Sequence, residues 1–159
     1  MRKLIGFRIN HGGGVPSYIF EWQNTNEAGA VELYRYRGIE PPRPELQEAA
    51  DRVANVATKM VELPTDRQAL FHNIDMEYPA KMKNGYKLRI KATAPIQRGY
   101  VFTFSTPVWD VFYPADKGEL NNTIRDAVLA LMQECWKYID GDRAQVKLDL
   151  GEDEKEKEK

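Results

Sequence analysis

The beginning of the chain contains three short segments of β-strand type, a weak first one and two in which side chains alternate with the period of a strand. These segments are Leu4–Ile9, Tyr18–Gln23 and Val31–Arg37. A turn-rich stretch of Asn, Thr and Gly separates the second from the third, so we expect these two to form a hairpin.

The pattern changes to a helical period between Pro44 and Leu63. Apolar residues recur every three or four positions on one side, and charged or amide residues occupy the other side. Pro44 fits the first helical position, where its missing N–H is not needed, and Pro64 ends the segment. We therefore predict an amphipathic helix with one face on a core.

The second part of the chain repeats this order of strands followed by a helix. The predicted strands are Leu70–Tyr78, Tyr86–Thr93, Gly99–Thr106 and, after a break at Pro107, Val108–Tyr113. The predicted second helix is Asp116–Asp140, because Asp116 and Glu119 have the spacing of a capping box and Gly141 suits a helix end. Arg143–Leu150 alternates again, which predicts a last short strand.

Asn84-Gly85 is a hairpin signal between the first two of these later strands. A strict two-residue turn there would mix the buried and exposed faces. We therefore predict a bulge near Pro79-Ala80 that sets Glu77 opposite Lys91.

The resulting order, βββα-βββα with an optional last strand, predicts an α+β fold with a mostly antiparallel sheet and two long helices. We predict a single domain over residues 1–150, built from units 1–64 and 65–150, followed by a disordered charged tail at 151–159. The two helices share apolar positions at one constant offset, which is compatible with an internal duplication and also with two unrelated strand–helix units. The matched positions are Glu45-Leu46 with Glu119-Leu120, Ala50 with Ile124 and Ala57 with Leu131.

Composition bounds the setting of the protein. The chain has 159 residues, of which 42% are hydrophobic, and it contains no apolar run long enough to span a membrane. The basic N-terminus lacks the apolar stretch of a secretory signal, and Cys135 has no second cysteine to pair with. We therefore expect a reducing, cytoplasmic setting and no membrane partner. The net charge of −1 is not by itself typical of a nucleic-acid-binding protein.

Motifs for catalysis, metal binding or cofactors are lacking in the sequence. The Gly12–Gly14 run leads into a strand rather than a helix and matches no phosphate-binding motif, so a mobile turn is the simpler interpretation. His72 falls on the apolar face of its predicted strand, and Cys135 falls in an apolar stretch of the second helix, where burial disfavours a thiolate. We therefore expect no metal, no cofactor and no enzyme activity, although paired carboxylates for acid–base catalysis stay open.

Cations interleave with aromatic residues along several predicted strands, and such a surface can stack bases and hold phosphates. The candidate ligand-binding residues are Tyr34, Arg35, Tyr36, Arg37, Lys87, Arg89, Lys91 and Arg98. The alternative is a solvated outer face, on which Asp75 and Glu77 pair with Arg89 and Lys91 across strands. As a ligand site, the pattern fits single-stranded nucleic acid and a nucleotide equally well.

The second helix is apolar on two sides through its middle. One side continues the predicted core, and the other consists of Leu129, Met132 and Trp136. Either the sheet curls around this helix or these three residues meet another subunit or a partner, since Trp and Met are enriched in interfaces. They form our candidate interface.

We therefore predict a non-enzymatic binding or accessory protein that acts through self-association or through contacts with a protein partner. Small chains without catalytic motifs are common among phage and mobile-element accessory factors, which makes such a factor one interpretation. A sheet module that binds single-stranded nucleic acid or a nucleotide is the alternative function.

Overall fold

The fold is given by a computed structural model, which describes residues 1–65, 67–96, 99–113 and 117–143. The strands are β1 (Arg2–Asn10), β2 (Ser17–Thr25), β3 (Val31–Gly38), β4 (Leu70–Glu77), β5 (Gly85–Pro95), β6 (Val101–Ser105) and β7 (Trp109–Phe112), and the helices are α1 (Pro44–Met60) and α2 (Glu119–Ile139). The predicted α+β class, with a mostly antiparallel sheet and two long helices, is confirmed.

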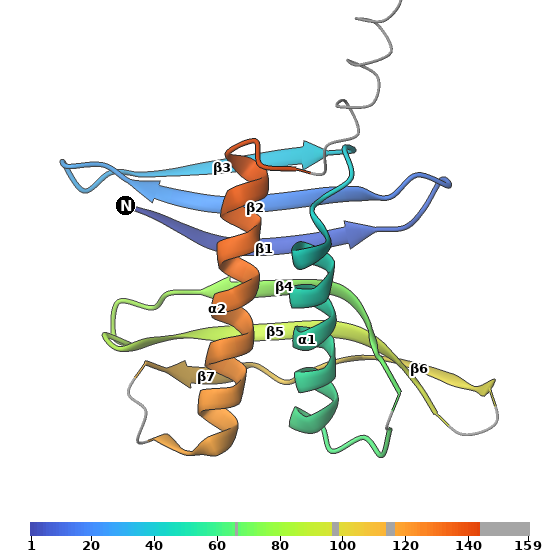
Figure 1. The fold of residues 1–159 in the computed structure, drawn as a ribbon. Helices are drawn as coiled ribbons and strands as arrows, with labels where there is room; N and C mark the ends of the chain where they lie inside the picture. The colour runs from blue at the N-terminus through green and yellow to red at the C-terminus, as the bar shows by residue number, and fades with distance from the viewer. Residues whose placement is uncertain (66, 97–98, 114–116, 144–159) are drawn as a thin grey trace, which may run out of the picture.

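All described strands form one sheet in the order β3-β2-β1-β4-β5-β6, and every pairing in it is antiparallel (Figure 1). The long strand β5 has two partners on the same side, because β6 lies along residues 91–95 and β7 lies along residues 85–88. The break between these two partners falls at Pro107, as the sequence indicated.

Both helices lie across the same face of the sheet and run antiparallel to each other (Figure 1). α1 packs against β4, β5 and α2. α2 reaches from β7 to the far side of the sheet, where Tyr138 contacts Tyr18 and Phe20 of β2. No described element covers the other face of the sheet, which we call the open face.

Tyr138, near the end of α2, closes the core over β2 and β3. Its ring stacks on Phe20 with 4.9 Å between centroids, and its hydroxyl donates a 2.6 Å hydrogen bond to the carbonyl oxygen of Glu40. The ring lies directly above Gly38, where a Cβ would come within 2.7 Å of Cε1 of Tyr138. Glycine is needed here because the ring occupies the space of a side chain.

The helix ends agree with the sequence in part. α1 begins at Pro44 as predicted and ends at Met60, before the predicted Leu63. α2 ends at Ile139, and Gly141 has a φ of 100°, so the predicted stop is confirmed. The start of α2 differs from the prediction.

α2 begins at Glu119. Its N-cap residue is Gly118, and no side chain makes a capping hydrogen bond there. The predicted cap, Asp116, lies outside the described residues, as do Arg98, the tail at 151–159 and all but the first residue of the predicted strand Arg143–Leu150.

The two halves of the sheet are related by an approximate two-fold rotation about the β1–β4 pair. Outward from this pair, β1, β2 and β3 follow on one side, and β4, β5 and β6 follow on the other. Each inner strand has a bulge at the matching place, between Leu4 and Gly6 in β1 and between Phe71 and Asn73 in β4. At one constant spacing, the buried residues Leu4, Phe7 and Ile9 match Phe71, Ile74 and Met76.

α1 and α2 are related by the same two-fold rotation. The positions that match between them differ from the predicted ones. Leu46 is buried whereas Leu120 exposes 37% of its surface, so these two positions are not equivalent. Moving the alignment by one helical turn matches buried residues throughout. The matched pairs are then Leu46 with Ile124, Ala50 with Val128, Val53 with Leu131, Ala57 with Cys135 and Met60 with Tyr138.

The register between β4 and β5 corrects two predictions. Glu77 lies opposite Lys87 rather than Lys91, because residues 78–84 form a longer loop and the bulge occurs at His72 instead of near Pro79-Ala80. The bulge also turns His72 away from the core. Its Nε2 lies 2.6 Å from the hydroxyl of Thr93 on the open face.

Candidate ligand-binding cleft

The predicted ligand residues of β3 divide between the two faces of the sheet. Tyr34 and Tyr36 face the helices: Tyr34 stacks on Trp22, and Tyr36 lies near Tyr138. Arg35 and Arg37 alternate with them and therefore lie on the open face. The aromatic and cationic residues of this segment thus do not form one surface.

The predicted ligand residues of β5 do lie together. Lys87, Arg89 and Lys91 occupy alternate positions on the open face. Lys87 pairs with Asp110 of β7 at 2.8 Å between nitrogen and oxygen. Among the described residues, neither Arg89 nor Lys91 has a carboxylate within ion-pair distance, so the predicted cross-strand pairs do not form.

The three predicted interface residues of α2 differ in exposure. Leu129 exposes 47% of its surface, whereas Met132 and Trp136 are partly buried against the core of the same chain. The ring of Trp136 meets Trp22 edge to face, and the guanidinium of Arg2 lies 4.2 Å from its centroid. These contacts account for most of the second apolar side of α2.

A cleft of about 730 Å³ opens beside β7 at the start of β5. Its wall comes from the β4–β5 loop, from β5 and β7, and from the residue two positions before α2. The lining residues are Pro79, Lys81, Met82, Lys83, Asn84, Lys87, Asp110, Phe112 and Lys117. Four lysines and one carboxylate therefore surround an apolar floor.

Among the described residues, three of the four lysines of this cleft have no ion-pair partner. Lys87 holds the carboxylate of Asp110, as described above. Lys117 lies with its ammonium nitrogen 5.5 Å from the centroid of the Phe112 ring. Within the described part of the chain, Lys81 and Lys83 are exposed and have no ion-pair partner. The cleft is consequently a region of positive potential.

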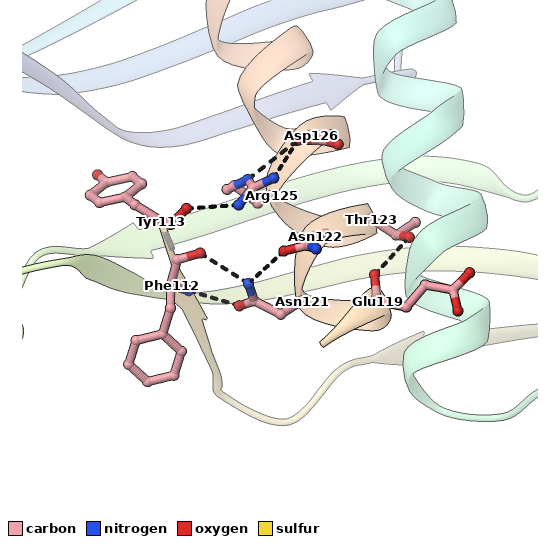
Figure 2. Close-up of polar contacts among 8 residues, drawn as sticks. All are labelled: Phe112, Tyr113, Glu119, Asn121, Asn122, Thr123, Arg125 and Asp126. Carbon is pink, nitrogen blue, oxygen red and sulfur yellow. Dashed lines mark hydrogen bonds and ion pairs between the residues drawn. The ribbon is translucent and has the colours of Figure 1, made fainter. Parts of the chain in front are cut away.

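Phe112 is fixed in the cleft by its backbone. Figure 2 shows Asn121 of α2 bonded to both polar groups of this residue: the amide N–H of Phe112 donates to Oδ1 at 2.8 Å, and Nδ2 donates to its carbonyl oxygen at 3.0 Å. Arg125 donates in the same way to the carbonyl of Tyr113 at 2.7 Å. α2 thereby positions the end of β7.

On its other side, β7 comes close to β5 because residue 85 is glycine. A Cβ on Gly85 would overlap the carbonyl oxygen of Val111. Phe112 pairs with Gly85 and shares the open face with Asp110 and Lys87. Its ring is therefore an aromatic surface on the open face, bordered by ammonium groups.

The cleft combines cationic side chains with an aromatic ring. Within the described residues, no three His, Cys, Asp or Glu side chains gather as metal ligands. Cys135 is buried in the core, and burial raises the pKa of its thiol well above the ordinary value, so a thiolate nucleophile is disfavoured. Ammonium groups around an aromatic ring can instead hold phosphate and stack a planar base.

Sequence reasoning found Lys87 but missed Lys81, Lys83, Phe112 and Lys117. The Lys-Met-Lys run at 81–83 was a usable signal of positive charge. This run lies near Phe112 only because β7 pairs with the first part of β5, and strand periodicity does not predict that pairing.

Comparisons with protein-family models, curated proteins and solved structures find no match to this chain. No helix in the described ranges is long and apolar enough to cross a membrane.

Proposed function

We propose that this chain is a non-enzymatic binding protein for a phosphate-bearing ligand with a planar base, which is the chemistry of a nucleotide or of single-stranded nucleic acid. The observation that carries the proposal is the presence of four lysines and a single carboxylate around the half-buried ring of Phe112. A cation-lined aromatic surface offers both of the contacts that such a ligand needs.

The two kinds of contact have separate roles. The ammonium groups attract phosphate as mobile point charges. The Phe112 ring can stack a base, an interaction worth about 1–3 kcal/mol in single-strand binding proteins. Lys87 already pairs with Asp110, so we expect the main electrostatic contribution to come from Lys81, Lys83 and Lys117.

β5 extends this site across the open face. Lys87, Arg89 and Lys91 are each two residues apart along the strand, which separates neighbours by roughly 6.8 Å. A polymer can continue along this row, whereas a mononucleotide would occupy only the cleft. Asp75 and Glu77 lie opposite Arg89 and Lys87 and repel phosphate, so we expect the row to add modestly to affinity.

Fluorescence anisotropy with a labelled oligothymidylate and with a labelled adenosine nucleotide tests the proposal. Lys83→Glu should weaken binding by about tenfold or more, because it reverses a charge at the cleft. Lys59→Glu makes the same charge change on the exposed side of α1 and should leave binding unchanged. Equal effects of the two substitutions, or no binding at low salt, would overturn the proposal.

The same assay separates the two ligand sources. For a single strand, log affinity should fall with log salt by about 0.7 per phosphate neutralised, so each cleft lysine changed to alanine should reduce this slope by about 0.7. Binding of the oligonucleotide alone indicates a polymer ligand. Equal binding of both probes indicates a nucleotide held in the cleft.

Self-association through α2 is our second proposal, in a cytoplasmic setting. It is favoured by the exposure of Leu129, the member of the predicted interface that the core does not cover. Leu129→Lys should leave the fold intact and reduce association, as measured by sedimentation equilibrium. A variant that associates as the unchanged chain does would count against this surface.

A further inference from the structure

β3 forms one outer edge of the sheet, and its outer backbone groups have no strand partner among the described residues. The strand runs for eight residues and pairs with β2 without a bulge. Val31 exposes 55% and Leu33 exposes 72% of its surface. Natural edge strands are usually protected by charged residues, especially lysine, or by proline, a bulge or short length. β3 has charged residues, Glu32, Arg35 and Arg37, but no lysine, proline or bulge, and it keeps Val31 and Leu33 exposed.

The opposite edge of the sheet is built differently. It consists of two short strands, β6 and β7, with Pro107 between them. The backbone of Phe112 at the end of β7 is already bonded by the side chain of Asn121. Among the described residues, β3 is therefore the edge with a long, regular row of backbone groups that lack a strand partner.

We infer that β3 pairs with β3 of a second copy of this chain, antiparallel and about a two-fold axis at Leu33. Such pairing extends the sheet from one copy into the other and satisfies the edge backbone groups of both. The proposal goes beyond ligand binding and concerns a surface distant from the cleft, since β2, β1 and β4 separate β3 from β5.

The sequence of β3 is compatible with itself in this register. Leu33 would meet Leu33 of the other copy on the open face, which covers the most exposed apolar residue of the strand. Val31 would lie opposite Arg35, and Glu32 opposite Tyr34, so no two like charges face each other. Because β3 is complementary to itself in this register, a second copy is the occupant that we propose.

The chain already uses this mode of association internally. β1 and β4 join the two halves of the sheet by antiparallel pairing of their inner strands about an approximate two-fold axis. The net charge of −1 gives little repulsion between copies. A β3–β3 pair would repeat the same contact between molecules.

Sedimentation equilibrium on the full chain tests the inference. The unchanged chain should dimerise, and Leu33→Lys should raise the dissociation constant by about tenfold or more, because two ammonium groups would meet at the axis. Val101→Lys on the opposite edge strand β6 is the matched control at an exposed position and should leave the dimer intact. Circular dichroism confirms that each variant is folded.

Cross-linking locates the axis independently. Cys135 is buried and does not compete, so a thiol introduced by Leu33→Cys should form a disulfide between copies under mild oxidation. Val101→Cys should not. A monomer at high micromolar concentration, a dimer unaffected by Leu33→Lys, or a dimer lost only with Leu129→Lys or Val101→Lys would overturn the inference.

Discussion

The side-chain amide of Asn121 acts toward Phe112 as a neighbouring strand would, accepting from its N–H and donating to its carbonyl oxygen (Figure 2). Asn121→Ala should remove both bonds and destabilise the protein by about 1–3 kcal/mol, since Phe112 loses the partners of two backbone groups. Urea unfolding measures this loss. Thr123→Ala, which removes one side-chain bond in the same helix, should cost no more than about 0.5 kcal/mol.

Amide exchange adds a local test of the same contact. The amide proton of Phe112 should exchange faster in Asn121→Ala than in Thr123→Ala, because its acceptor is lost. Equal protection in the two variants would show that β7 is held by β5 alone.

Gly38→Ala should be among the most damaging small substitutions in the chain. The added methyl group would collide with the ring of Tyr138, which is held by its bond to Glu40, and such overpacking costs about 1–3 kcal/mol. Gly6→Ala is the control, because a Cβ added at Gly6 would lie 3.7 Å from the nearest atoms of other side chains, which is an ordinary contact distance. Thermal unfolding should separate the two, and combining Gly38→Ala with Tyr138→Leu should restore part of the loss.

Arg2 and Trp136 should be energetically coupled within one chain. The guanidinium lies over the indole and also bonds both carboxylate oxygens of Asp140, at 3.0 and 2.7 Å. A double-mutant cycle of Arg2→Ala and Trp136→Ala in urea should give a coupling of about 0.5–1 kcal/mol. A coupling that appears only at high protein concentration would instead place Trp136 in an interface.

His72 should make stability depend on pH. Burial lowers the pKa of its imidazole below the ordinary 6.5, and the positive charge of Lys91 lowers this pKa further. The folded chain then binds a proton less readily than the unfolded chain, so stability should fall from about pH 7 to about pH 5. His72→Gln keeps a partner for Thr93 and should remove this part of the pH dependence.

An NMR titration tests the cause of the shift. Lys91→Ala should raise the pKa of His72 toward 6.5, because a nearby positive charge is removed. Lys59→Ala, a change of the same charge on α1, should not alter it.

The sequence was informative where one period persists over a long segment. The one-sided pattern of α1 and the start at Pro44 follow from spacing and from the chemistry of proline, and both agree with the structure. The bulge at His72 did not follow, because a bulge changes which face a residue takes without leaving a mark in composition. That one shift explains why strand alternation wrongly predicts a core position for His72.

The candidate site was less predictable for a related reason. Alternation correctly put Lys87, Arg89 and Lys91 on one face, because the strand is regular. Alternation also requires that Tyr34 and Arg35 point to opposite faces of the sheet. It does not tell which of these faces the helices cover. Phe112 joined the lysines through the tertiary pairing of β7 with β5, which local sequence does not specify.

The way the helices cross the sheet joins the two halves into one unit. α1 follows β3 in the chain, yet it packs against β4 and β5, and α2 follows β7, yet its end packs against Tyr18 and Phe20 of β2. Each half thus contributes a helix that packs on strands of the other half. Neither half buries its own helix completely, so we expect both to melt in a single transition, and separately expressed halves should regain structure only when mixed.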